Sequence, residues 1–196
     1  MCKEQKACYE AKRKAIETVL GEMDKPVGHA IIAFEAGGAI DMHYYSNHIQ
    51  GTGFATMELI GHDTKYSKPN MLGHYEFLGF TRHSKIYQGN VNDYYKKIER
   101  RFCKIFTELA DYSSQTVLNP KDTIEASVSE DEIAYLILDK YDDFKVLEEK
   151  HHLLLVVEVF KSEIEYAIQN GVDKLIEKLK HSKVYPYSDL DRKVVI

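Results

Sequence analysis

The sequence predicts one α+β domain, in which a largely antiparallel sheet of about six strands packs with three main helices. The first reason is the order of the hydrophobic periods, because helical spacing gives way to strand-like alternation and later returns. The second is composition: 196 residues, 44% of them apolar and 29% charged, suit a folded globular chain. The third is that no repeat, low-complexity tract or Pro/Ser-rich linker divides residues 1–196, which favours a single domain.

The first half of the chain predicts one helix followed by four strands. Residues 6–20 carry apolar side chains near helical spacing, and Gly21 follows as a stop signal. Strand-like patterns then occupy residues 30–35, 40–45, 54–60 and 74–82. The dipeptide Gly37-Gly38 separates the first two at hairpin length, and the short connections favour antiparallel neighbours.

A second helix is predicted over residues 91–112, where the helical period returns. Its apolar stripe consists of Tyr94, Ile98, Phe102, Ile105, Phe106 and Leu109. The other side carries Lys96, Lys97, Arg100, Arg101 and Lys104. This basic face could bind phosphates, but a solvated face is the favoured interpretation because the whole chain has a net charge of −5.

The second half predicts a loop, two strands and a last helix. Residues 119–122 (NPKD) form the loop, and strands follow near residues 133–138 and 152–159. The second strand contains LLLVV without a polar break, which is typical of a strand buried on both faces. We expect the S-x-x-E spacing from Ser162 to cap the last helix, Asn170-Gly171 to interrupt it, and residues 182–196 to form a surface or disordered tail.

The sequence carries no specific catalytic or cofactor motif, so we expect no enzymatic activity and no cofactor. Gly51-Thr52-Gly53 begins like a dinucleotide loop, but Thr56 replaces the third glycine and a strand follows instead of a helix. There is no G-x-S-x-G elbow, and Cys103 lies inside the long helix, where a small buried hydrophobe is the simpler interpretation.

Nine histidines raise the question of a metal, but no H-E-x-x-H or C-x-x-C spacing is present. His74 and Glu76 share one face of an expected strand, and His43 could face them across the sheet. This arrangement would allow a metal site without requiring one, and we expect none.

The chain is expected to be cytoplasmic. Three cysteines without framework spacing suit a reducing compartment, and the charged N-terminus lacks the apolar segment of a signal peptide. The longest apolar run, residues 153–157, is far too short to span a membrane. We therefore expect neither a membrane nor a nucleic acid as partner, and the sequence leaves the oligomeric state open.

Charge is distributed unevenly, because residues 130–149 hold eight acidic and two basic side chains. The simpler interpretation is a pair of solvated loops that flank a strand. The functional one is an acidic surface that steers a basic protein partner. With two tyrosines of the interface-prone kind, the candidate partner-binding residues are Tyr44, Tyr45, Glu130, Asp131, Glu132, Asp142 and Asp143.

Five stretches in this order resemble the bacterial branch of the suppressor-of-fused family. They are GTGFATMELIG (51–61), YEFLGFTRH (75–83), LNPKDTIE (118–125), HLLLVVEVFKSEIEYAIQNG (152–171) and YPYSDLDR (185–192). The resemblance implies a suppressor-of-fused-like α+β domain and an immunity or antitoxin protein that binds and neutralises a cognate toxin. It transfers no binding residues, and the two-domain peptide clamp of the animal relative does not carry over to a chain of this length.

Three hypotheses therefore remain. The leading one is stoichiometric inhibition of a toxin, for instance a nuclease with a basic active-site groove. The alternative is an intracellular regulator or scaffold that captures partner peptides by adding a strand to an exposed sheet edge. The third is an enzyme or metal protein that uses its histidines.

Overall fold

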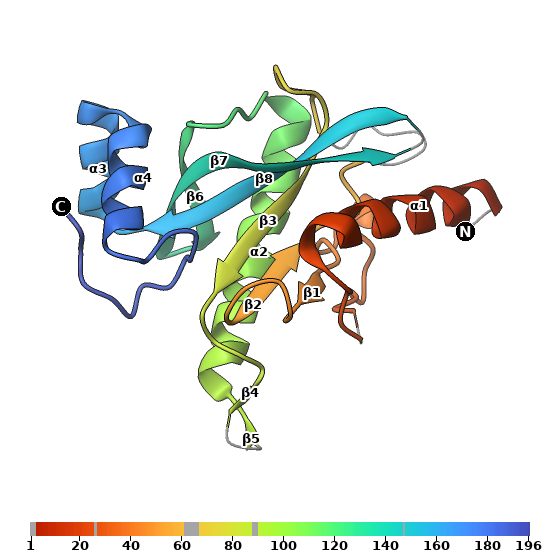
Figure 1. Ribbon diagram of the computed structural model, residues 1–196, viewed down its shortest axis with the longest axis horizontal. Coiled ribbons are helices and arrows are strands. Elements are labelled where there is room, and N and C mark those ends of the chain that lie inside the picture. The colour runs from red at the N-terminus through yellow and green to blue at the C-terminus, as the bar shows by residue number, and fades with distance from the viewer. Residues whose placement is uncertain (1–2, 26, 61–66, 88–89, 147) are drawn as a thin grey trace.

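A computed structural model describes residues 3–25, 27–60, 67–87, 90–146 and 148–196. The chain forms three layers, with a six-stranded sheet in the middle. Figure 1 shows helix α2 (Asp93–Gln115) behind the sheet, and α1 (Lys3–Leu20) with the pair α3 (Lys161–Asn170) and α4 (Val172–His181) in front, at opposite ends. A short hairpin of β4 (Ile86–Tyr87) and β5 (Asn90–Val91) connects the sheet to α2.

The sheet is mixed. Across it, the strands lie in the order β1 (His43–Tyr45), β2 (Thr52–Ala55), β3 (Tyr75–Thr81), β8 (Glu149–Val159), β7 (Glu132–Val146) and β6 (Thr123–Ser129). Neighbours are antiparallel except β3 and β8, which run parallel at the centre with Leu78 opposite Leu155. The expectation of a largely antiparallel sheet was wrong, because the chain passes through α2 and the β6–β7 hairpin before it returns beside β3.

Strand β8 joins the two hydrophobic cores. Leu153, Leu155 and Val157 pack on the side of α1, α3 and α4, whereas Leu154 and Val156 pack on the side of α2. All five side chains are buried, so the prediction of a strand covered on both faces is confirmed.

Helix α2 closes the second core. It begins after Asn92, whose side chain accepts the backbone N–H groups of Tyr94 and Tyr95. The predicted helix is confirmed, although Tyr95 is the buried tyrosine and Tyr94 is 42% exposed. The close fit to the sheet requires a glycine in β3, because a Cβ at Gly79 would lie 2.2 Å from the Phe102 ring.

The first predicted strand, residues 30–35, is wrong. A 3₁₀-helix, η1 (Phe34–Ala36), occupies its end, and Gly37 closes that helix with a φ of 83° instead of forming a hairpin. The alternating pattern was misleading, because Ile31 and Ile32 are 105% and 57% exposed and do not pack into the core. The next two predicted strands are confirmed only in part, because β1 begins at His43 and β2 ends at Ala55.

The second half also differs from expectation. Strand β6 was missed. Strand β7 contains the strand predicted near residues 133–138 but runs for 15 residues, through much of the second of the two loops that were expected to flank it. The last helix begins at Lys161, before the proposed Ser162 cap, and the Phe160 N–H donates to the Glu163 carboxylate at 3.0 Å. Gly171 divides the helix in two as predicted, so the chain has four helices of at least ten residues among the described residues.

The C-terminal tail packs against the sheet. Tyr187 bridges to Phe80 in parallel register, and the Ser188 N–H donates to the Phe80 carbonyl at 2.9 Å. Arg192 forms two 2.7 Å bonds to the fully buried carboxylate of Glu163. The tail is therefore an ordered part of the fold rather than a disordered end.

Candidate functional site

A groove runs between helix α2 and strand β6, which forms one edge of the sheet. Strand β6 pairs with β7 on one side, and no described strand lies on its other side. Beside it is a depression of about 300 Å³, lined by Glu108, Leu109, Tyr112 and residues 123–127. A second depression of about 340 Å³ lies further along α2 and is lined by Tyr94, Lys97, Ile98, Arg100, Arg101, Lys104, Val128 and Glu132. We call these residues together the α2–β6 groove.

The helical period explains why these side chains share one side of α2. Positions 97, 101, 104, 108 and 112 are three or four residues apart, so they project from the same face. From Tyr94 to Tyr112 the helix rises by about 27 Å. Seven extended residues of β6 span roughly 24 Å. The helix and the strand edge are thus matched in length to an extended segment of about seven residues.

The groove is basic at one end. Lys97, Arg100 and Lys104 are exposed, and none forms an ion pair with another described residue. Arg101, in contrast, has partners within the chain: its Nε donates to the buried Glu158 carboxylate at 2.6 Å, and its Nη1 pairs with Glu132. The other end carries the exposed acids Glu108 and Glu125, so the charge changes from positive to negative along the groove.

Arg101 and Glu158 fix the floor of the basic end. Burial raises the pKa of Glu158, and the hydrogen bonds and charge of Arg101 oppose that rise. The same hydrogen bonds raise the pKa of Arg101, against its own burial. The ion pair holds α2 against β8, so the backbone that presents Lys97 and Lys104 is anchored.

Of the two tyrosines expected to contact a partner, one is buried and the other is half-buried. Tyr45 has 0% exposure and belongs to the core beneath α1, so it offers no surface to a partner. Tyr44 is half-buried and packs edge-on against Phe54 at 5.8 Å. Burial, followed by the hydrogen bond that the Tyr44 hydroxyl donates to the Glu99 carboxylate, raises the pKa of Tyr44. Tyr45 therefore has no surface for a partner, whereas partner contact at the half-buried Tyr44 stays a prediction.

The expected acidic residues do not form one patch. Glu130 and Asp131 lie exposed at the turn between β6 and β7, and Glu132 is paired with Arg101. Asp142 and Asp143 lie about ten residues further along β7, roughly 35 Å away in an extended strand. Only the first group is close to the α2–β6 groove.

Asp143 is also neutralised by its neighbours. Its carboxylate accepts Lys140 and Lys150, each at 2.8 Å. Burial opposes ionisation, but these two hydrogen bonds lower the pKa of Asp143. The long strand β7 therefore divides the acidic window into a free tip and a paired segment.

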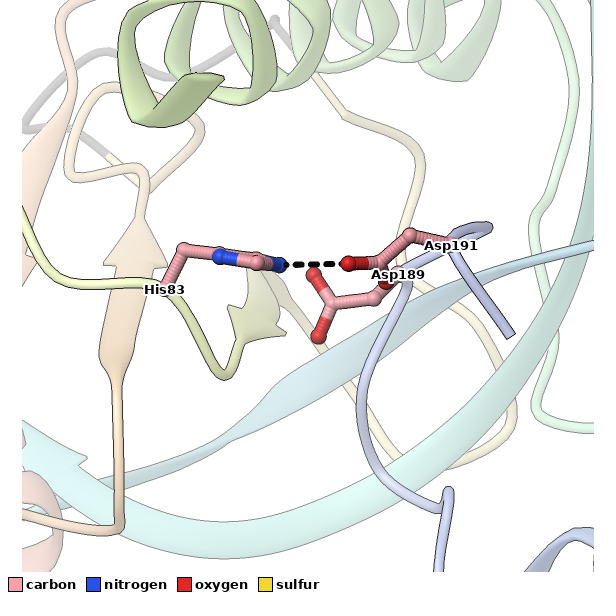
Figure 2. A group of neighbouring side chains, drawn as sticks. All are labelled: His83, Asp189 and Asp191. Atoms are coloured by element: carbon pink, nitrogen blue, oxygen red, sulfur yellow. Dashed lines mark hydrogen bonds and ion pairs between the residues drawn. The ribbon is translucent and has the colours of Figure 1, made fainter. Parts of the chain in front are cut away.

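The histidines suggested for a metal are not brought together. Glu76 is taken by Lys12, whose Nζ lies 2.9 Å from its carboxylate. His43 Nδ1 lies 3.2 Å from the sulfur of Met23 instead. Within the described ranges, a different group has three metal-ligating side chains in proximity, namely His83, Asp189 and Asp191 (Figure 2). Sequence reasoning missed it because more than a hundred positions separate its histidine from its aspartates.

The geometry thus defines a three-layer α+β protein with a groove along one free sheet edge. The model of the suppressor of fused protein family matches residues 76–193, more than half of the chain, and the chain belongs to that family. A solved structure described as "the Sufu-Fu complex crystal structure" is similar over 97% of this chain and 91% of that chain, with a TM-score of 0.64 and 13% identity.

No curated protein matches the sequence. At 13% identity, the structural likeness concerns the fold alone. Among the described residues, no helix has both the length and the apolar character needed to cross a membrane.

Proposed function

We propose that this protein acts by stoichiometric binding of a protein partner rather than by catalysis, and that the α2–β6 groove is the contact surface. The observation that carries the proposal is the free edge of β6 beside two depressions of about 300 and 340 Å³. An extended segment added to such an edge gains backbone hydrogen bonds along its length, and pockets beside the edge select its side chains.

The side chains of β6 suit this mode of binding. Ala126 and Val128 are buried toward α2, whereas Ser127 and Ser129 are exposed on the other face. A strand paired to β6 would place alternate side chains over α2, against Tyr112 at one end and Lys104 at the other. The partner would gain affinity from the strand edge and specificity from the helix.

Two further observations support the proposal. The similar solved structure is described as a complex of Sufu with Fu. In this chain, the exposed aromatic ring of Tyr112 at the groove is the kind of side chain that anchors interfaces.

The finer proposal is that the partner is a bacterial toxin and that binding neutralises it. It rests on the resemblance to the immunity branch of the family and on the exposed acids Glu130 and Asp131 at the turn between β6 and β7, next to the basic end of the groove. These acids would face a basic surface of the toxin, such as a nuclease groove, while an extended toxin segment occupies the β6 edge. Capture of peptides from a regulatory partner, the second candidate, would use the same edge without the acidic tip.

Co-expression with a toxin encoded beside this gene tests the proposal. We expect a one-to-one complex on gel filtration and growth protection of the host cell. Tyr112→Ala should weaken the complex about 30-fold, since truncating an aromatic interface anchor costs about 2 kcal/mol. The matched control is Ile168→Ala, which removes an exposed apolar side chain from α3 on the opposite face of the sheet. Absence of a complex and of protection would refute toxin neutralisation, and equal effects of the two variants would refute the groove.

A further inference from the structure

A second candidate site lies where the C-terminal tail meets the end of β3. The imidazole of His83 and the carboxylates of Asp189 and Asp191 each offer a ligand atom, and these atoms all lie within 4.8 Å of one another. Figure 2 shows both carboxylates next to the imidazole, one from each side of a bend in the tail. His83 Nε2 lies 3.1 Å from the Asp191 carboxylate.

The fold holds these groups in position from three elements. The Asp189 carboxylate accepts the Thr81 hydroxyl and the Arg82 N–H, the latter at 2.8 Å. The His83 ring packs edge-on against Tyr94 of α2, with centroids 4.7 Å apart. The ligand atoms are thus placed by the sheet, the tail and the helix, and not by one mobile loop.

The charge at this point is not balanced. Asp189 is only 5% exposed, yet no lysine or arginine among the described residues forms an ion pair with it or with Asp191. The cations nearest in sequence have other partners. Arg82 bonds the Lys183 carbonyl and lies over the Tyr187 ring, and Arg192 bonds the Glu163 carboxylate. A nearly buried carboxylate without a cationic partner is costly in a protein interior.

A small cavity of about 80 Å³, lined in part by Asp189, Ser188 and Tyr94, adjoins the carboxylate and has room for water.

We propose that His83, Asp189 and Asp191 bind one divalent transition-metal ion such as Zn²⁺ or Mn²⁺. Two ligand atoms that each lie about 2.1 Å from an ion are about 3.4 Å apart in a tetrahedral site and about 3.0 Å apart at right angles in an octahedral one. The 3.1 Å between His83 and Asp191 lies between these values. One imidazole and two carboxylates form a mixed set that suits these ions, whereas Mg²⁺ and Ca²⁺ favour oxygen ligands alone. Water completes the coordination on the exposed side of Asp191.

The bound ion would fasten the tail to the sheet. It replaces the missing cationic partner of Asp189 and links residues 189–191 to the segment that follows β3. Because it binds the folded chain and not the unfolded one, it should raise the melting temperature, and the rise should grow with the logarithm of the ion concentration above the dissociation constant. This site does not depend on the proposed groove function.

Metal titration of the full, untagged chain tests the inference after treatment with EDTA. Calorimetry with ZnCl₂ and then MnCl₂ should show one ion per chain, with a rise in melting temperature at saturation. Asp191→Asn and His83→Gln should each weaken binding at least about 10-fold. The matched controls Asp131→Asn and His29→Gln change exposed residues elsewhere and should bind as the parent does.

Circular dichroism of each variant separates loss of the site from loss of the fold. Asp191 is 47% exposed at its side chain, so its amide variant should fold normally. The inference is overturned if the parent chain binds neither ion stoichiometrically. It is equally overturned if folded Asp191→Asn and His83→Gln bind as tightly as the two controls, because the cluster is then a hydrogen-bonded clamp only.

Discussion

Replacing Lys12 by methionine should be among the most damaging single changes in the chain. Its side chain is 3% exposed, and the Glu76 side chain that it contacts is 0% exposed. The Nζ group donates to Glu76 at 2.9 Å and also to the carbonyls of Met57 and Ile60. This ammonium group ties α1 to the sheet and to the segment that follows β2.

Methionine would leave a buried negative charge behind. Glu76 would keep its hydrogen bonds from the Thr56 hydroxyl at 2.7 Å and the Ile60 N–H at 2.9 Å, but it would lose its cation. Breaking one partner of a buried pair costs about 3–5 kcal/mol. For a chain of this size, that corresponds to a fall of roughly 10 °C in melting temperature.

Urea unfolding followed by circular dichroism measures this loss, with two further variants to assign it. Lys12→Met/Glu76→Gln removes both charges and should recover about half of the lost free energy, because the amide oxygen still accepts the local donors. Arg13→Met removes the next cation of α1, which pairs with Glu10 and Glu17 at the surface and should cost less than about 1 kcal/mol. If Lys12→Met costs no more than Arg13→Met, the reasoning on the buried pair is refuted.

Two other predictions concern buried groups. Burial lowers the pKa of His43 and of His152 to about 4, below the ordinary value of 6.5. As the pH falls, these histidines take up protons in the unfolded chain before they do so in the folded chain. Their contribution to the free energy of unfolding is therefore fully present above about pH 6.5, and about 3 kcal/mol for each histidine is lost as the pH drops toward 4. Urea unfolding at several pH values measures this loss, and the His152→Gln variant should show a weaker dependence of the free energy of unfolding on pH. Gly79→Ala should cost about 1–3 kcal/mol in the same assay, since the new Cβ would press on Phe102, and an unchanged midpoint would contradict the close packing of α2.

The sequence was most informative where one element buries a continuous face. Helix α2 and strand β8 follow directly from a helical stripe and from an unbroken apolar run. Residues 30–35 show alternation without burial, which is why the strand expected there was wrong. Strand β6, with the polar sequence TIEASVS, has the opposite problem, since an edge strand needs few apolar residues. The parallel pairing of β3 with β8 joins distant segments, and local patterns cannot predict it.

The site was harder to predict than the fold. Tyrosine is a residue type that is common at interfaces, but Tyr45 lies in the core. The acidic window looked contiguous because its residues are neighbours in sequence, but an extended strand separates the two ends of that window. The α2–β6 groove depends on contact between segments that no motif links, and its only signal was the basic face of the helix.

Hydrogen–deuterium exchange on the complex with the co-expressed partner would show whether the β6 edge is the contact surface. We expect slowed exchange in β6, residues 123–129, and on the facing turns of α2, with unchanged exchange in α3 and α4. A stable complex in which residues 123–129 exchange as fast as in the free chain would contradict this expectation.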